Sequence, residues 1–167
     1  MLKHGAVRWY ALAALVIVLD QASKLWITAN FQLHEVRQVT SYFDLLLTYN
    51  PGAAFSFLAN AGGWQRHFFT VLALVVSAVL ARMLFKEYGK RRLALALSLV
   101  LGGALGNVID RIAYGHVIDF LSFHGAIFKL VLGTPYFPAF NLADSAICVG
   151  AGLLVLDSAL SPKPAKA

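Results

Sequence analysis

Two aspartates lie in apolar stretches without an adjacent lysine or arginine, and they are the strongest candidates for chemistry in this chain. Asp144 lies in FNLADSAICVG (140–150), three residues after Asn141, and Asp119 lies in VIDFLSF (117–123). An ionisable group inside such an apolar run is costly to keep, so it indicates a function. When two carboxyl groups lie close together, one keeps its proton while the other ionises. Such a pair could supply the acid and the base of a hydrolytic reaction, as in aspartic proteases.

Other polar residues recur at helical spacing inside apolar segments. Asp20 and Lys24 are four residues apart, so they share a helical face and can form an ion pair. Asn107, Asp110 and Arg111 are separated by three and four residues and also share one face. For these groups a structural network that fixes helix packing is the favoured interpretation, since each carboxylate has a cation nearby in the sequence.

Two alternatives to hydrolysis follow from the same residues. Carboxyl groups in membrane proteins also relay protons or cations, so a small proton-coupled transporter or channel subunit would need them too. A four-span scaffold whose polar groups only pack helices is the other alternative. Against transport, the chain shows no repeated halves with broken helices.

The composition identifies an integral membrane protein. Of 167 residues, 59% are hydrophobic and only 13% are charged, whereas soluble domains carry about 25% charged residues. The net charge of +6 is explained by basic residues flanking membrane spans, so we expect no nucleic-acid partner. The single cysteine excludes an internal disulfide, and the five histidines form no HExxH motif, so we expect no metal site.

The elements that must position these residues are four apolar runs, each long enough or nearly so to cross a bilayer about 30 Å thick. The predicted spans of this single membrane domain (1–167) are about 9–28, 67–85, 93–112 and 138–159. Basic residues precede the first span, join the second to the third in KEYGKRR (86–92), and follow the fourth. The bias of basic residues towards the cytoplasm therefore places both termini there and the loops at 29–66 and 113–137 outside. The polar residues of five segments then lie at the outer face.

The two outer loops carry structural signals of their own. HEVRQVTSYFDLLLTYN (34–50) is rich in β-branched and aromatic residues, which predicts a small sheet at about 30–60 on the outer membrane surface. AAFSFL (53–58) predicts a short amphipathic segment. VIDFLSFHGAIFKLVL (117–132) is apolar but broken by charge, so we predict an interfacial or partly re-entrant segment. Gly102 and Gly106 predict close helix packing.

Five sequence blocks in a fixed order resemble the lipoprotein signal peptidase family, also called signal peptidase II. They are DQASK (20–24), NPGAAFS (50–56), GGALGNVIDR (102–111), GHVIDF (115–120) and FNLADSAI (140–147). The resemblance covers about 9–160. It implies an all-α integral membrane fold, with four transmembrane helices, a small extramembrane β-cradle and a short amphipathic helix on the outer face.

The resemblance also implies a function. Members are aspartic endopeptidases of the bacterial inner membrane that remove the signal peptide from diacylglyceryl-modified prolipoproteins, immediately before the lipidated cysteine. They need no cofactor, and globomycin inhibits them. By motif, Asp119 and Asp144 would be the catalytic pair, while Asn50 and Arg111 would contact the substrate. A further group would support the site: Asp20, Lys24, Asn107, Asp110 and Asn141. A monomer would be sufficient.

One region departs from the family pattern. LSFHGAIFKLVLGTPY (121–136), between the two catalytic blocks, carries no motif and is longer and more apolar than the family leads us to expect. No family role is carried over to it.

Overall fold

The structure is a computed structural model and describes residues 4–52 and 63–160. The amphipathic segment predicted at 53–58 lies outside the described residues, so its conformation stays a prediction.

Four helices in the described part of the chain are long and apolar enough to cross a membrane. They are α1 (His4–Asn30), α2 (Trp64–Glu87), α3 (Arg91–Ala113) and α5 (Leu142–Leu160). Together with a small antiparallel sheet, they confirm the predicted fold class. The last helix begins at Leu142, four residues later than the run that the sequence suggested, because Asn141 caps it.

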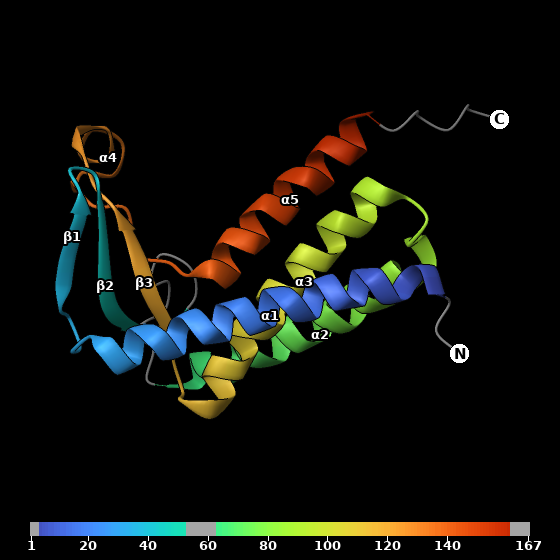
Figure 1. Cartoon of the computed structure of the whole chain (residues 1–167), viewed down its shortest axis with the longest axis horizontal. Coiled ribbons are helices and arrows are strands. Elements are labelled where there is room, and N and C mark those ends of the chain that lie inside the picture. The colour runs from blue at the N-terminus through green and yellow to red at the C-terminus, as the bar shows by residue number, and fades with distance from the viewer. Residues whose placement is uncertain (1–3, 53–62, 161–167) are drawn as a thin grey trace.

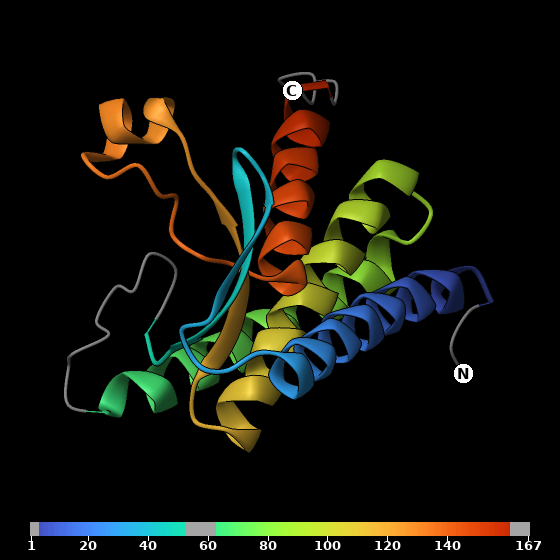
Figure 2. The same ribbon diagram turned by 60° about the vertical axis from the view of Figure 1, so that its left-hand side comes forward.

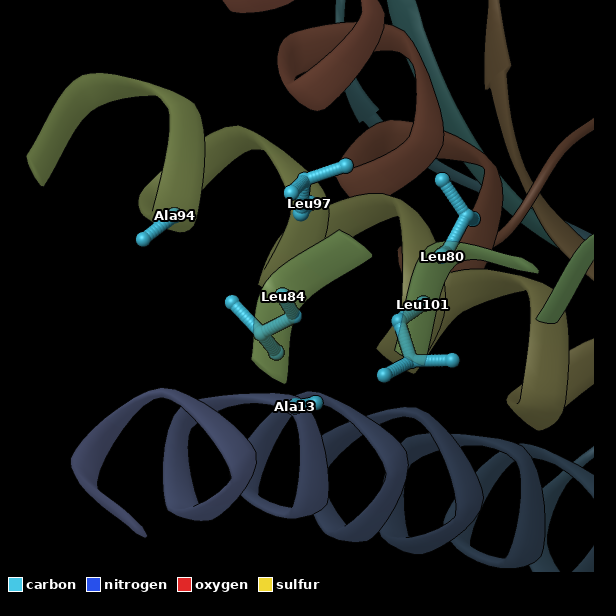
Figure 3. Close-up of a cluster of buried hydrophobic side chains, with 6 residues drawn as sticks. All are labelled: Ala13, Leu80, Leu84, Ala94, Leu97 and Leu101. Atoms are coloured by element: carbon cyan, nitrogen blue, oxygen red, sulfur yellow. The ribbon is translucent and has the colours of Figure 1, made fainter. Parts of the chain in front are cut away.

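The helix α3 lies at the centre and packs against each of the other three long helices. Side chains from α1, α2 and α3 meet in an apolar cluster, drawn in Figure 3, which includes Leu84 and Leu97, both fully buried. Close approach of α1 and α3 requires Gly102, since a β-carbon there would lie 2.7 Å from the Ala13 carbonyl oxygen. The predicted role of Gly102 in helix packing is therefore confirmed.

The sheet contains three antiparallel strands in the order β1 (Val36–Thr40), β2 (Phe43–Asn50) and β3 (Val117–Phe123). The first two form a hairpin within the region predicted to be strand-like. The third strand comes from the other outer loop and pairs Asn50 with Val117 and Thr48 with Asp119. This long-range pairing joins the two outer loops into one unit.

The segment 117–132 is not one interfacial or re-entrant element, so that prediction is wrong for its first half. Residues 117–123 form β3, and α4 (Ala126–Leu132) follows. The strand is buried on both sides, with Val117, Ile118 and Phe120 at most 4% exposed. A strand covered on both faces has a continuous apolar sequence, and periodicity cannot distinguish it from a short buried helix.

The sheet lies at one end of the helix bundle. In Figure 1, α1 starts and α5 ends towards the opposite end, where α2 also connects to α3. Figure 2 shows the sheet rising beside α5, with α4 at its far tip. The polar residues singled out in the sequence lie where the sheet meets the bundle.

Candidate active site

Asp119 lies on β3 and is held by two side-chain amides. Asn50 donates from Nδ2 to Asp119 Oδ2 at 3.1 Å, and Asn141 donates from Nδ2 to Asp119 Oδ1 at 2.8 Å. Asn50 ends β2 and accepts a bond from the Gly52 backbone amide, so its side chain is fixed by the NPG turn. Asp119 is only 2% exposed.

Asp144 occupies the first turn of α5 and forms a reciprocal cap with Asn141. The Asp144 backbone amide donates to Asn141 Oδ1 at 2.9 Å, and the Asn141 backbone amide donates to Asp144 Oδ2 at 3.3 Å. This is the geometry of a capping box, with an asparagine at the cap and an aspartate three residues later. The three-residue spacing between Asn141 and Asp144 therefore reflects the start of a helix.

The chain between Asp119 and Asn141 folds back on itself to bring them together. Leu121 and Phe140 exchange backbone hydrogen bonds at 2.8 and 3.0 Å, so the segment leading into α5 lies along the free edge of β3. Asn141, the next residue, consequently contacts both Asp119 and Asp144. The two predicted catalytic residues thus share one hydrogen-bonding neighbour.

A buried network links both aspartates to the helices. Asn107 on α3 donates to Asp144 Oδ1 at 2.8 Å and accepts from Asn141 and from Lys24 Nζ. Lys24 in turn pairs with Asp20 Oδ2 at 2.8 Å and with Asp110 Oδ2 at 2.7 Å. The ammonium group is therefore surrounded by oxygen acceptors, as a buried charge requires.

The structure corrects one pairing. Asp110 was expected to pair with its neighbour Arg111, but its cation is Lys24 of α1. Adjacent residues on a helix point in different directions, whereas Lys24 reaches across the interface between α1 and α3. Arg111 instead donates to the backbone carbonyls of Gly52 and Asn107 at 3.1 and 3.3 Å.

The two acidic residues of this network, Asp20 and Asp110, also accept hydrogen bonds from backbone amides next to the candidate catalytic residues. Asp20 accepts from the Ala143 amide at 3.0 Å, in the first turn of α5, and Asp110 accepts from the Ile118 amide at 3.1 Å, next to Asp119. Gln21, which the sequence analysis did not single out, donates to Asp20 and Asp110. The network therefore sets the position of both candidate catalytic residues.

Burial changes the ionisation of Asp119. Loss of water raises the pKa of its carboxyl group from 3.8 to about 7, and the negative charge of Asp144 also raises it. The hydrogen bonds from Asn50 and Asn141 act in the opposite direction but do not cancel the effect. Asp119 therefore holds its proton at pH values where an ordinary aspartate has lost it.

Two cavities meet at this carboxyl group. One, of about 680 Å³, lies between α2, α3 and α5 and is mostly apolar, with Leu72 and Val76 on one wall and Ile147 on another. The other, of about 570 Å³, lies under the sheet and is lined by β2 and by 134–139. Asn50 and Asp119 line both cavities, and Asp144 lines the apolar one.

The polar network is confined to one end of the bundle. At the other end, α1, α2 and α3 are joined by the apolar cluster described above. Such an arrangement disfavours a proton or ion path across the bundle. Among the described residues, no group of three or more His, Cys, Asp or Glu side chains is placed to bind a metal.

Comparison with known sequences identifies the family of this chain. The sequence model described as signal peptidase (SPase) II matches residues 12–160. The chain belongs to the signal peptidase II family. It is therefore an aspartic-type peptidase and a multi-pass membrane protein.

Individual relatives agree with this assignment. The lipoprotein signal peptidase of Chromobacterium violaceum is 54% identical over 160 residues, 95% of each chain. That of Shewanella loihica is 51% identical over 162 residues, 96% of this chain and 91% of its own. A bacterial membrane enzyme solved by the in meso method at 2.3 Å superposes with a TM-score of 0.76 at 27% identity, over 95% and 94% of the two chains.

Proposed function

We propose that this signal peptidase II cleaves diacylglyceryl-modified prolipoproteins immediately before the lipidated cysteine, with Asp119 and Asp144 as its catalytic pair. One observation carries the proposal. Asp119 of β3 and Asp144 of α5 both form hydrogen bonds with Asn141, and both line the apolar cavity. We place the proton on Asp119, because burial raises the pKa of its carboxyl group to about 7. Asp144, at the N-terminus of α5, then carries the negative charge that a helix N-terminus stabilises.

The two roles follow from these protonation states. As a water oxygen attacks the scissile carbonyl carbon, the Asp144 carboxylate takes a proton from that water, and Asp119 donates its proton to the carbonyl oxygen. The resulting diol collapses when the carbon–nitrogen bond breaks. Asp144 gives its proton to the leaving cysteine amine, and Asp119 recovers one from the diol. Both carboxyl groups return to their starting states, and no cofactor takes part.

Two neighbours are proposed to hold the substrate backbone. Arg111 reaches the Gly52 carbonyl beside the site, and its Nε atom is buried without a hydrogen-bond partner among the described residues. That donor can bind a substrate carbonyl. Asn50 contacts Asp119 directly, so a peptide bond placed at the carboxyl group also lies within reach of the Asn50 amide.

The two cavities match the two chemical halves of the substrate. The apolar cavity between α2 and α5 suits the signal peptide and the acyl chains. The cavity under the sheet contains Thr48 and Ser122 and suits the polypeptide that follows the cysteine. The scissile bond would then lie at Asp119, where both cavities meet. Globomycin, an inhibitor of the family, is proposed to bind the same site.

We place the enzyme in the bacterial inner membrane with both termini in the cytoplasm and the active site near the outer face. The basic segment 86–92 lies at the end of the bundle where α1 starts, as Figure 1 shows. Basic segments remain on the cytoplasmic side, so the sheet faces outwards. We also propose that the enzyme acts as a monomer.

The test is cleavage of a purified prolipoprotein by the purified enzyme in detergent, with and without the diacylglyceryl group. We expect wild type to cut only the lipidated form, and Asp119→Asn and Asp144→Asn each to abolish cleavage. Asp157→Asn, at the far end of α5, is the matched control and should cleave like wild type. Near-normal turnover by either dyad variant at equal folding would refute the assigned roles.

A further inference from the structure

The short helix α4 presents an apolar surface at the tip of the sheet. Leu130 is 83% exposed, Val131 70% and Ile127 61%, and Lys129 is the only charged residue of the helix. Single exposed apolar residues are common on proteins, but three of them together on one short helix mark a contact surface.

The segment 124–136, which contains α4, is attached to the sheet by backbone hydrogen bonds at its two ends. The His124 amide donates to the Tyr42 carbonyl at 3.0 Å, and the Gly125 amide donates to the Pro135 carbonyl at 2.8 Å. Phe128 of α4 packs against Phe137 with ring centroids 5.5 Å apart. The helix therefore already uses one aromatic side chain for internal packing and directs its other apolar side chains outwards.

The position of α4 indicates what covers it. In both views α4 lies at the tip of the sheet, apart from the four long helices (Figures 1 and 2). Apolar residues of α5 are also exposed, with Val149 at 57% and Val155 at 71%. Because α5 spans the bilayer and begins where the sheet meets the bundle, the outer membrane surface lies at the end of the bundle that carries the sheet and α4.

We propose that α4 is an interfacial membrane anchor that inserts into the outer leaflet. Ile127, Leu130 and Val131 would enter the acyl boundary, as the apolar faces of interfacial helices do. Lys129 would extend its ammonium group to the lipid phosphates, and the exposed ring of Tyr136 would lie at the headgroup level.

A lipid surface fits α4 better than a protein partner does. A specific protein interface needs about 800 Å² on each side, which a helix of seven residues cannot supply alone. Lipid has no such minimum and is already present beside α5. This anchor would hold the tip of the sheet against the bilayer, so that the cavity under the sheet opens next to the membrane surface.

The test measures the depth of α4 with a fluorophore and does not depend on proteolysis. Leu130→Cys is made in a Cys148→Ser background, labelled with a small environment-sensitive dye, and reconstituted into vesicles of phosphatidylethanolamine and phosphatidylglycerol. Val155→Cys on α5 is the lipid-facing control, and Gln32→Cys, after the outer end of α1, is the water-facing control. Each labelled protein is exposed to nitroxide-labelled lipid and, separately, to aqueous iodide.

We expect the dye at position 130 to behave like the dye at 155, with quenching by nitroxide lipid several-fold stronger than quenching by iodide. Quenching by iodide at the level of position 32 would overturn the proposal, since α4 would then lie in water. Protection from both quenchers, together with energy transfer between labelled copies, would also overturn it, because a second copy of the chain would then cover α4.

Discussion

The charge of Asp119 is predicted to destabilise the folded enzyme, and the size of the effect follows from its ionisation. A rise of the pKa from 3.8 to about 7 corresponds to roughly 4 kcal/mol. Below pH 3.8 the group is protonated in both the folded and the unfolded chain, so it contributes nothing. Between 3.8 and about 7 only the unfolded chain releases the proton, so the free energy of unfolding falls as pH rises. Above about 7 the loss is constant.

Asp119→Asn removes this dependence because the amide is neutral at every pH. The difference in free energy of unfolding between the variant and wild type should therefore grow from pH 4 to pH 7, by about 4 kcal/mol, and then level off. At roughly 2–4 °C per kcal/mol for a chain of this size, the variant should gain about 8–16 °C in melting temperature over that range. The same variant should be inactive.

The assay is thermal unfolding in one detergent from pH 4 to pH 9, with wild type and variant measured in parallel. Ser122→Ala is the matched control, because Ser122 is buried on the same strand and carries no ionisable group. Its difference from wild type should not change with pH. A pH-independent difference for Asp119→Asn as well would refute the argument that burial raises the pKa of this carboxyl group.

Three further outcomes follow from the site. Cleavage by wild type should decline as pH rises above about 7, because Asp119 then loses the proton that it donates; a pH–rate profile of the purified enzyme measures this. Lys24→Met should lower the free energy of unfolding by about 3–5 kcal/mol, measured by denaturation in detergent, since two buried carboxylates lose their cation. Gly106→Ala should cost about 1–3 kcal/mol and slow cleavage, because its β-carbon would lie 2.6 Å from Asp20 Oδ2. Gly152→Ala, with open space around it, should do neither, which makes it the control for Gly106→Ala.

Spacing and hydropathy were enough to predict that the polar residues of separate helices converge. Lipid offers no hydrogen bonds, so the polar face of each span must turn towards the other helices. This reasoning placed Asp20, Lys24 and Asn107 together correctly. It worked because each helix carries its polar residues on a single face, and because the basic segments suggested which ends of the spans lie together.

The same reasoning could not identify partners that are distant in sequence. Asp110 has a cation next to it in the chain but pairs with Lys24, because the direction of a side chain depends on helix packing. The third strand was missed since its partner, β2, is about 70 residues away. The cap formed by Asn141 could have been found from the sequence, because N-x-x-D before an apolar run is a variant of a known helix-start signal.

The two aspartates are proposed to act as a pair, yet the structure supports their carboxyl groups in different ways. Asp144 completes the cap of α5 and accepts a bond from Asn107, so its carboxylate contributes to the helix start as well as to chemistry. Asp119 sits on a buried strand, where its charge opposes folding. The Asp20–Lys24–Asp110 network supports both positions, because it fixes the backbone amides of Ala143, next to Asp144, and of Ile118, next to Asp119. Asp20 and Asp110 are fully buried and both pair with Lys24, so water cannot easily compete for the bonds that hold these two amides.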